Sequence, residues 1–69
     1  MRSFTLRAKR ANGTYSTRVF LSSSDKEAIV SGAFMVMRLA YPNREPWANG
    51  QIELVNDLGV IIAEMGAKQ

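Results

Sequence analysis

Two alternating runs of apolar and polar residues, separated by Asn12-Gly13, constrain the fold of this chain more than any other feature. An Asn-Gly pair between such runs favours a two-residue hairpin turn of type I′, because that turn needs two consecutive residues with positive φ. The turn fixes the register and places Phe4 opposite Leu21, so residues 3–21 are predicted to form a β-hairpin. Its apolar face is predicted to consist of Phe4, Leu6, Ala8, Val19 and Leu21.

The opposite face of this hairpin is predicted to combine cations with an aromatic ring. The register places Arg7 opposite Arg18, although like charges directly opposite each other lower stability. Lys9 and Phe20 share that face, and cations beside an aromatic ring are typical of surfaces that contact phosphates, bases or acidic proteins. We therefore expect these four residues to bind a partner. The alternative is that both arginines point into solvent and Phe20 packs beneath a loop.

Residues 24–41 are predicted to form a helix. Ser24 is a typical N-cap, and Glu27 three residues later completes a capping box. Pro42 ends the helix, because the residue before a proline avoids the α conformation. At about 100° per residue, one broad apolar face is predicted to pack on a sheet. That face consists of Ile29, Val30, Ala33, Phe34, Val36, Met37, Ala40 and Tyr41.

A second apolar stripe on the same helix consists of Ala28, Gly32, Met35 and Leu39. A helix that is apolar nearly all round is either buried or covered by a partner, and a chain of 69 residues has little material to cover both sides. Small residues at the first two positions would let a second helix approach closely. The stripe is therefore predicted to be a homodimer interface. The alternative is that the loop after the helix folds over it.

That loop, residues 42–50, contains two prolines, an Asn-Gly pair and Trp47, the one tryptophan of the chain. In a small domain a loop tryptophan is favoured as a lid on the core. Tryptophan is also enriched at binding hot spots. Trp47 is therefore kept as a candidate partner-binding residue beside its favoured role as a lid.

Residues 51–65 are predicted to form a second hairpin around the turn at 56–59, with Val55 paired to Val60. A slip of one residue would set Glu64 among the core side chains, so the pattern favours this register. The core face of this hairpin is predicted to consist of Ile52, Leu54, Ile61, Ala63 and Met65. The whole chain is thus predicted to be one α+β domain of order ββαββ, a four-stranded antiparallel sheet with one helix packed on one face.

The composition argues against catalysis. The chain has no cysteine and no histidine, which excludes disulfides, thiolate or imidazole metal ligands and histidine-activated nucleophiles. It contains no Gly-rich phosphate loop and no nucleophile elbow. We therefore expect a protein that is not an enzyme and that binds no metal or cofactor.

The charge is distributed unevenly. The net charge is +3, and the first 20 residues contain cations but no acid, which suggests an acidic protein or a nucleic acid as partner. The sequence predicts a non-catalytic protein-binding module, an inhibitor or modulator of the kind that phages encode, which acts by stoichiometric occlusion of a larger partner. The alternatives are nucleic-acid binding through the basic N-terminal hairpin and an assembly subunit. No signal peptide or membrane span is recognisable, so we expect a cytoplasmic protein without membrane contact.

Overall fold

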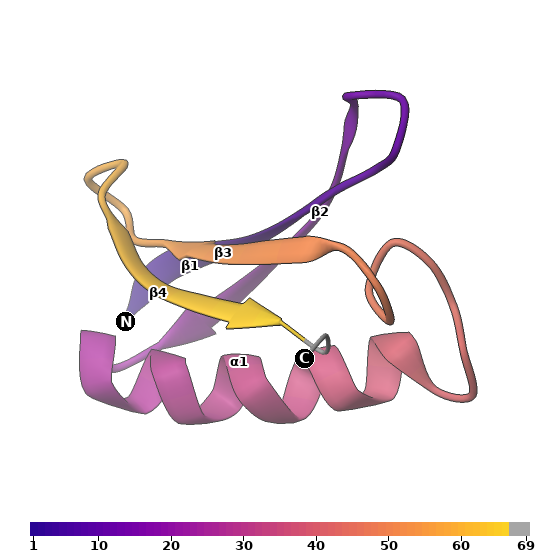
Figure 1. Ribbon diagram of the computed structural model, residues 1–69. Helices are drawn as coiled ribbons and strands as arrows, with labels where there is room; N and C mark the ends of the chain where they lie inside the picture. Colours follow the sequence, from indigo (N-terminus) through magenta and orange to yellow (C-terminus); the bar gives the residue numbers. More distant parts are fainter. Residues whose placement is uncertain (67–69) are drawn as a thin grey trace.

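The structure is a computed structural model and describes residues 1–66 of the chain. It confirms the predicted α+β fold, a four-stranded antiparallel sheet with one helix on one face (Figure 1). The strand order, which the sequence left open, is β2-β1-β3-β4. In chain order the elements are β1 (Arg2–Lys9), β2 (Tyr15–Ser22), α1 (Asp25–Ala40), β3 (Gln51–Val55) and β4 (Ile61–Gly66).

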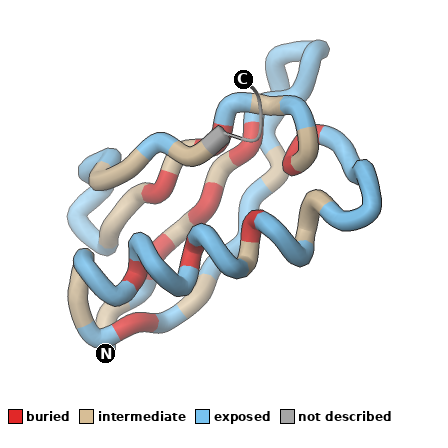
Figure 2. Tube along the Cα trace, turned by 60° about the horizontal axis from the view of Figure 1, so that its bottom comes forward, coloured by how far each residue is buried: buried red, intermediate tan, exposed pale blue. Residues whose placement is uncertain are grey.

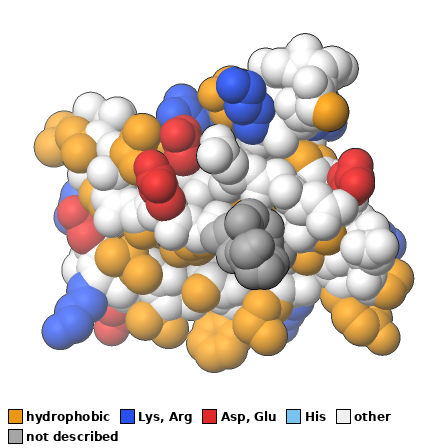
Figure 3. Space-filling model, viewed as in Figure 1, with side chains coloured by type: hydrophobic (Ala, Val, Ile, Leu, Met, Phe, Trp, Pro, Cys, Tyr) orange, Lys and Arg blue, Asp and Glu red, His pale blue; other side chains and the backbone are white. Residues whose placement is uncertain are grey.

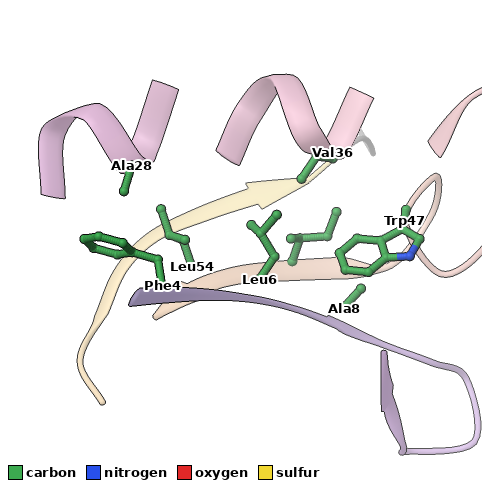
Figure 4. Packing of buried hydrophobic residues seen from close by; sticks show 8 residues of the cluster. Phe4, Leu6, Ala8, Ala28, Val36, Trp47 and Leu54 are labelled. Atoms are coloured by element: carbon green, nitrogen blue, oxygen red, sulfur yellow. The ribbon is translucent and has the colours of Figure 1, made fainter. Parts of the chain in front are cut away.

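The hydrophobic core lies between α1 and the two central strands, β1 and β3. Figure 2 shows buried residues along these strands and on the side of α1 that faces them. In Figure 4 their side chains occupy the layer between helix and sheet. The core consists of Phe4, Leu6, Ala8, Ala28, Val36, Trp47, Ile52 and Leu54.

The turn between β1 and β2 has three residues rather than the predicted two. Arg10 N donates to Thr14 O at 2.8 Å, and Gly13 N donates to Arg10 O at 3.0 Å. Gly13 has φ of 91°, and no described residue other than a glycine has positive φ. Asn12 therefore lacks the backbone conformation that a type I′ turn requires, and the turn matches the three-residue class with glycine in the left-handed region.

This longer turn shifts the predicted register by one residue. Phe4 lies opposite Phe20 instead of Leu21. Because side chains alternate across a strand, the shift exchanges the two faces of β2. Val19 and Leu21 lie on the outer side of the sheet, 62% and 64% exposed, while Phe20 stacks on Phe4 with ring centroids 5.9 Å apart. The prediction that Phe20 belongs to an outer cationic face is wrong for this reason.

The turn between β3 and β4 has the same form. Asn56 N donates to Val60 O at 2.9 Å, and Gly59 has φ of 83°. The three-residue turn pairs Val55 with Ile61 rather than with Val60, and a β-bulge between Val55 and Leu54 then pairs Leu54 with Ala63. The extra residue of a bulge reverses the side-chain alternation beyond it. Ile52, Leu54, Ala63 and Met65 thus share a face as predicted, while Ile61 is exposed and Ile62 packs against the core.

Helix α1 begins and ends almost where the sequence predicts. Ser24 is the N-cap, and its Oγ accepts a hydrogen bond from Glu27 N at 3.2 Å. The rotation of the helix about its axis differs from the prediction. Of the residues expected to face the sheet, Val36 is buried and Ala40 is partly buried. The others are exposed: Ile29, Val30, Ala33, Phe34, Met37 and Tyr41.

The stripe that was predicted to be a dimer interface packs on the sheet instead. Ala28 is fully buried, and a Cβ on Gly32 would lie 3.6 Å from Leu6 and 3.7 Å from Leu54. Met35 and Leu39 pack against the same core. The assignment of this stripe to a homodimer interface is therefore wrong. Large side chains already project from β1 and β3, so small residues on the facing helix allow the two layers to approach.

The loop between α1 and β3 carries Trp47 into the core. Trp47 is 7% exposed, which confirms the favoured lid role and contradicts its assignment as a partner-binding residue. In Figure 4 its ring lies beside Ala8. The loop is packed closely against the end of β1, because a Cβ on Gly50 would lie 2.6 Å from Pro46 O and 2.7 Å from Lys9 O. Only glycine fits at such a backbone contact.

Candidate protein-binding surface

One side of α1 carries large apolar side chains that nothing in the described chain covers. We call this surface the outer helix face. Its exposed fractions range from 38% for Ile29 to 77% for Tyr41. Figure 3 shows hydrophobic side chains gathered along the side of the molecule where α1 lies. The outer helix face consists of Ile29, Val30, Phe34, Met37 and Tyr41.

The size of the outer helix face is unusual for a chain this small. From the exposed fractions, these side chains present roughly 500 Å² of apolar surface, near the upper end of the largest patch on a typical monomer. One partner in a standard protein–protein interface buries about 800 Å². The outer helix face therefore supplies much of one side of such an interface.

Two opposite charges lie along one flank of the outer helix face. Glu27 and Arg38 are both exposed, and they are separated by about three helical turns, roughly 16 Å along the axis. Arg38 forms no ion pair with any described residue, and the Glu27 carboxylate accepts a hydrogen bond only from the Ser23 hydroxyl among them. Both charges are thus available to a partner that covers the apolar stripe beside them.

On the outer face of the sheet, Arg7 is already paired. Its Nη2 lies 2.5 Å from Glu53 Oε1, and its guanidinium lies 5.4 Å from the centre of the Tyr15 ring. The carboxylate on β3 thus neutralises the charge that the sequence assigned to a partner. Lys9 is exposed on the same strand.

Arg18 lies on the other face of the sheet. It pairs with Leu6 on the helix side of the edge strand β2, so the predicted opposition of Arg7 and Arg18 is wrong. A charge at this position discourages another strand from adding to the edge. The predicted partner-binding residues are therefore divided among two sheet faces and the core. Nucleic-acid binding stays a prediction, with Lys9 and Arg10 as exposed cations near the first turn.

Arg2 joins three segments of the fold. Its guanidinium forms ion pairs with Asp25 at 2.9 Å and with Asp57 at 3.0 Å. It also lies over the Phe4 ring, 5.4 Å from the ring centre. The hydrogen bond from Arg2 holds the pKa of Asp57 below its ordinary value, and the same bond raises the pKa of Arg2. This cluster connects β1 to the start of α1 and to the β3–β4 turn, which is a structural role.

A cavity of about 590 Å³ lies between the β1–β2 turn and the loop that precedes β3. Its charged lining consists of Lys9, Arg10 and Glu45. The Glu45 carboxylate accepts a hydrogen bond from Asn49 Nδ2 at 2.8 Å, and Arg10 donates to Thr14 at 3.3 Å. All of these side chains are exposed, with no buried polar group among them. Water therefore reaches the charged groups of this cavity, and none of them forms the buried acid–base pair that a catalytic site would need.

Neither a metal-binding cluster nor a membrane-spanning helix is present in the described part of the chain. Between residues 1 and 66, no group of three or more acidic, cysteine or histidine side chains is arranged to hold a metal ion. No helix among these residues has both the length and the apolar content that crossing a membrane requires.

Sequence reasoning missed the outer helix face because it assigned the same residues to the core. One signal was present: the residues that pack on the sheet include alanine and glycine at helical spacing, which suit a close layer contact. Comparison with known proteins adds no functional information, since no family model, curated protein or solved structure matches the chain.

Proposed function

We propose that this protein is a non-catalytic protein-binding module that acts through the outer helix face. The observation that carries the proposal is the exposure of Val30, Phe34, Met37 and Tyr41 in one continuous stripe. Large apolar side chains gain free energy when a partner removes them from water. A stripe of this kind suits the apolar surface of another protein better than the charged backbone of a nucleic acid.

The effect on a partner is stoichiometric occlusion. Phe34 lies in the middle of the stripe and is 63% exposed, the position and residue type typical of an energetic hot spot. An interface of this size belongs to the smaller protein–protein contacts, which form reversible complexes with about micromolar dissociation constants. Saturation of the partner should therefore occur at a fixed ratio and reverse on dilution.

The test uses two matched substitutions at exposed apolar positions. Phe34→Asp places a charge in the outer helix face, while Val19→Asp places one on the outer side of the sheet, where Val19 is 62% exposed. Proteins captured by the natural chain are purified and titrated with both variants by calorimetry. We expect Phe34→Asp to abolish binding and Val19→Asp to retain it. Binding that survives Phe34→Asp, or catalytic conversion of excess partner by a trace of this protein, would refute the proposal.

A further inference from the structure

We propose that the outer helix face binds a second copy of this chain, with the two α1 helices antiparallel across a twofold axis. This inference rests on the proposed function and names the partner of the same surface. A second copy is favoured by the straight apolar stripe, by the two charges on one flank, by the cation at the N-terminal end of the stripe and by the area of the surface.

The apolar stripe is continuous along the helix. At about 100° per residue, Val30, Phe34, Met37 and Tyr41 fall within a sector of roughly 60°. All four side chains are more than half exposed. A straight stripe of this kind can pack against an identical stripe, since side chains at i, i+4 and i+7 form ridges that fit the grooves of a facing helix.

The flanking charges select the antiparallel arrangement. Glu27 lies near the start of α1 and Arg38 near its end, on the same side of the stripe. A twofold axis perpendicular to both helices places Glu27 of one copy beside Arg38 of the other, and repeats that pair by symmetry. In a parallel twofold arrangement Glu27 would lie beside Lys26 of the other copy, but Arg38 would have no acidic residue of the partner helix beside it. The antiparallel arrangement is thus the one in which both flanking charges, Glu27 and Arg38, are paired.

Lys26 adds a third contact in the same orientation. It is exposed at the N-terminal end of the stripe, on the flank opposite Glu27. In the antiparallel pair it lies near Tyr41 and the C-terminal end of the partner helix. The aromatic ring and the negative end of the helix dipole both favour a cation there.

The area also fits a second copy. Two outer helix faces together offer at most about 1,000 Å² of apolar surface, the size of the smaller, weaker protein–protein interfaces. The dimer should therefore be weak and dependent on concentration. It leaves the Arg7–Glu53 pair and the β2 edge uncovered, because these lie outside the outer helix face.

The test is a charge-swap series in the full chain, measured by sedimentation equilibrium up to about 100 µM, well above the dissociation constant expected for such an area. We expect Glu27→Arg and Arg38→Glu each to weaken the dimer about tenfold or more, because each replaces two ion pairs with two repulsions. The double variant should restore the dimer. An equimolar mixture of the two single variants should form a heterodimer. Circular dichroism checks that each variant is folded.

The outcomes separate this inference from the proposed function. A natural chain that is monomeric at that concentration overturns the inference, and so does a dimer that the single swaps leave unchanged. In either case the proposed function still stands if Phe34→Asp abolishes binding to a purified heterologous partner. Glu27→Arg also removes the Ser23–Glu27 hydrogen bond at the N-terminal end of α1. The double variant lacks the same hydrogen bond, so a dimer restored in the double variant shows that the charges, and not this bond, control dimerisation.

Discussion

Replacement of Gly32 by alanine should stabilise the protein, although Gly32 is buried against the sheet. In a helix interior, glycine is less favourable than alanine by about 1 kcal/mol. Against this gain, the new methyl group would lie 3.3 Å from Met65 Cε, slightly too close. That atom is the end of a flexible side chain, and a small movement relieves the contact.

The net effect is an increase in the free energy of unfolding of about 0.5–1 kcal/mol, which raises the melting temperature by several degrees in a domain of this size. Gly32→Leu should have the opposite effect. Its larger side chain would have to enter the layer occupied by Leu6 and Leu54, and overpacking of this kind costs about 1–3 kcal/mol. Thermal and urea unfolding followed by circular dichroism measure both changes.

A matched control is Ala33→Gly at the adjacent, exposed position. It should lower stability by about 1 kcal/mol, because it reports helix propensity without the contact to the sheet. If Gly32→Ala lowers the melting temperature, the layer between helix and sheet is more rigid than we infer. If Gly32→Leu leaves the unfolding free energy unchanged, Gly32 does not face the sheet and the helix rotation described above is wrong.

Three further predictions concern the loop and the charges. Gly50→Ala should destabilise by about 1–3 kcal/mol, since its Cβ would meet two fixed backbone oxygens, and the unfolding midpoint in urea measures this. Trp47→Ala should lower the free energy of unfolding by about 3–5 kcal/mol, which is comparable to the whole stability of so small a core. The far-ultraviolet circular dichroism spectrum should then show an unfolded chain. The interaction with Arg2 lowers the pKa of Asp57 and therefore stabilises the folded state at any pH above the ordinary aspartate pKa. This stabilisation is lost as the pH falls through the lowered pKa. Arg2→Ala should return the pKa of Asp57 to its ordinary value, which an NMR titration measures.

The features that the sequence predicted correctly are local. Ser24 caps the helix because a hydroxyl satisfies a free N–H there, whatever the helix packs against. The four strands follow from alternation and from turn residues in the same way. Phe4, Leu6 and Ala8 were assigned to the core correctly because β1 is a central strand whose alternation is regular.

The features that the sequence did not predict correctly depend on turn geometry. Asn12-Gly13 fits a two-residue turn with two positive φ values and a three-residue turn with one. The sequence pattern does not separate these, because both keep glycine in the left-handed region. Asn56 and Gly59 form the second turn of the same class. One residue of difference in loop length then reversed the predicted faces of β2, including Phe20.

The rotation of α1 explains why the outer helix face was missed and what it implies for stability. Both sides of the helix are apolar, so periodicity alone could not decide which side the sheet would take. The side with Ala28 and Gly32 packs closely on large strand residues, and the larger Phe34 and Met37 remain in water. Complete burial of such a side chain contributes about 1.5–3 kcal/mol, and each of these partly exposed side chains forgoes part of that amount. Association through the outer helix face would recover part of this free energy, so binding and stability are coupled by mass action. The melting temperature of the natural chain should therefore rise with protein concentration, while that of Phe34→Asp should not.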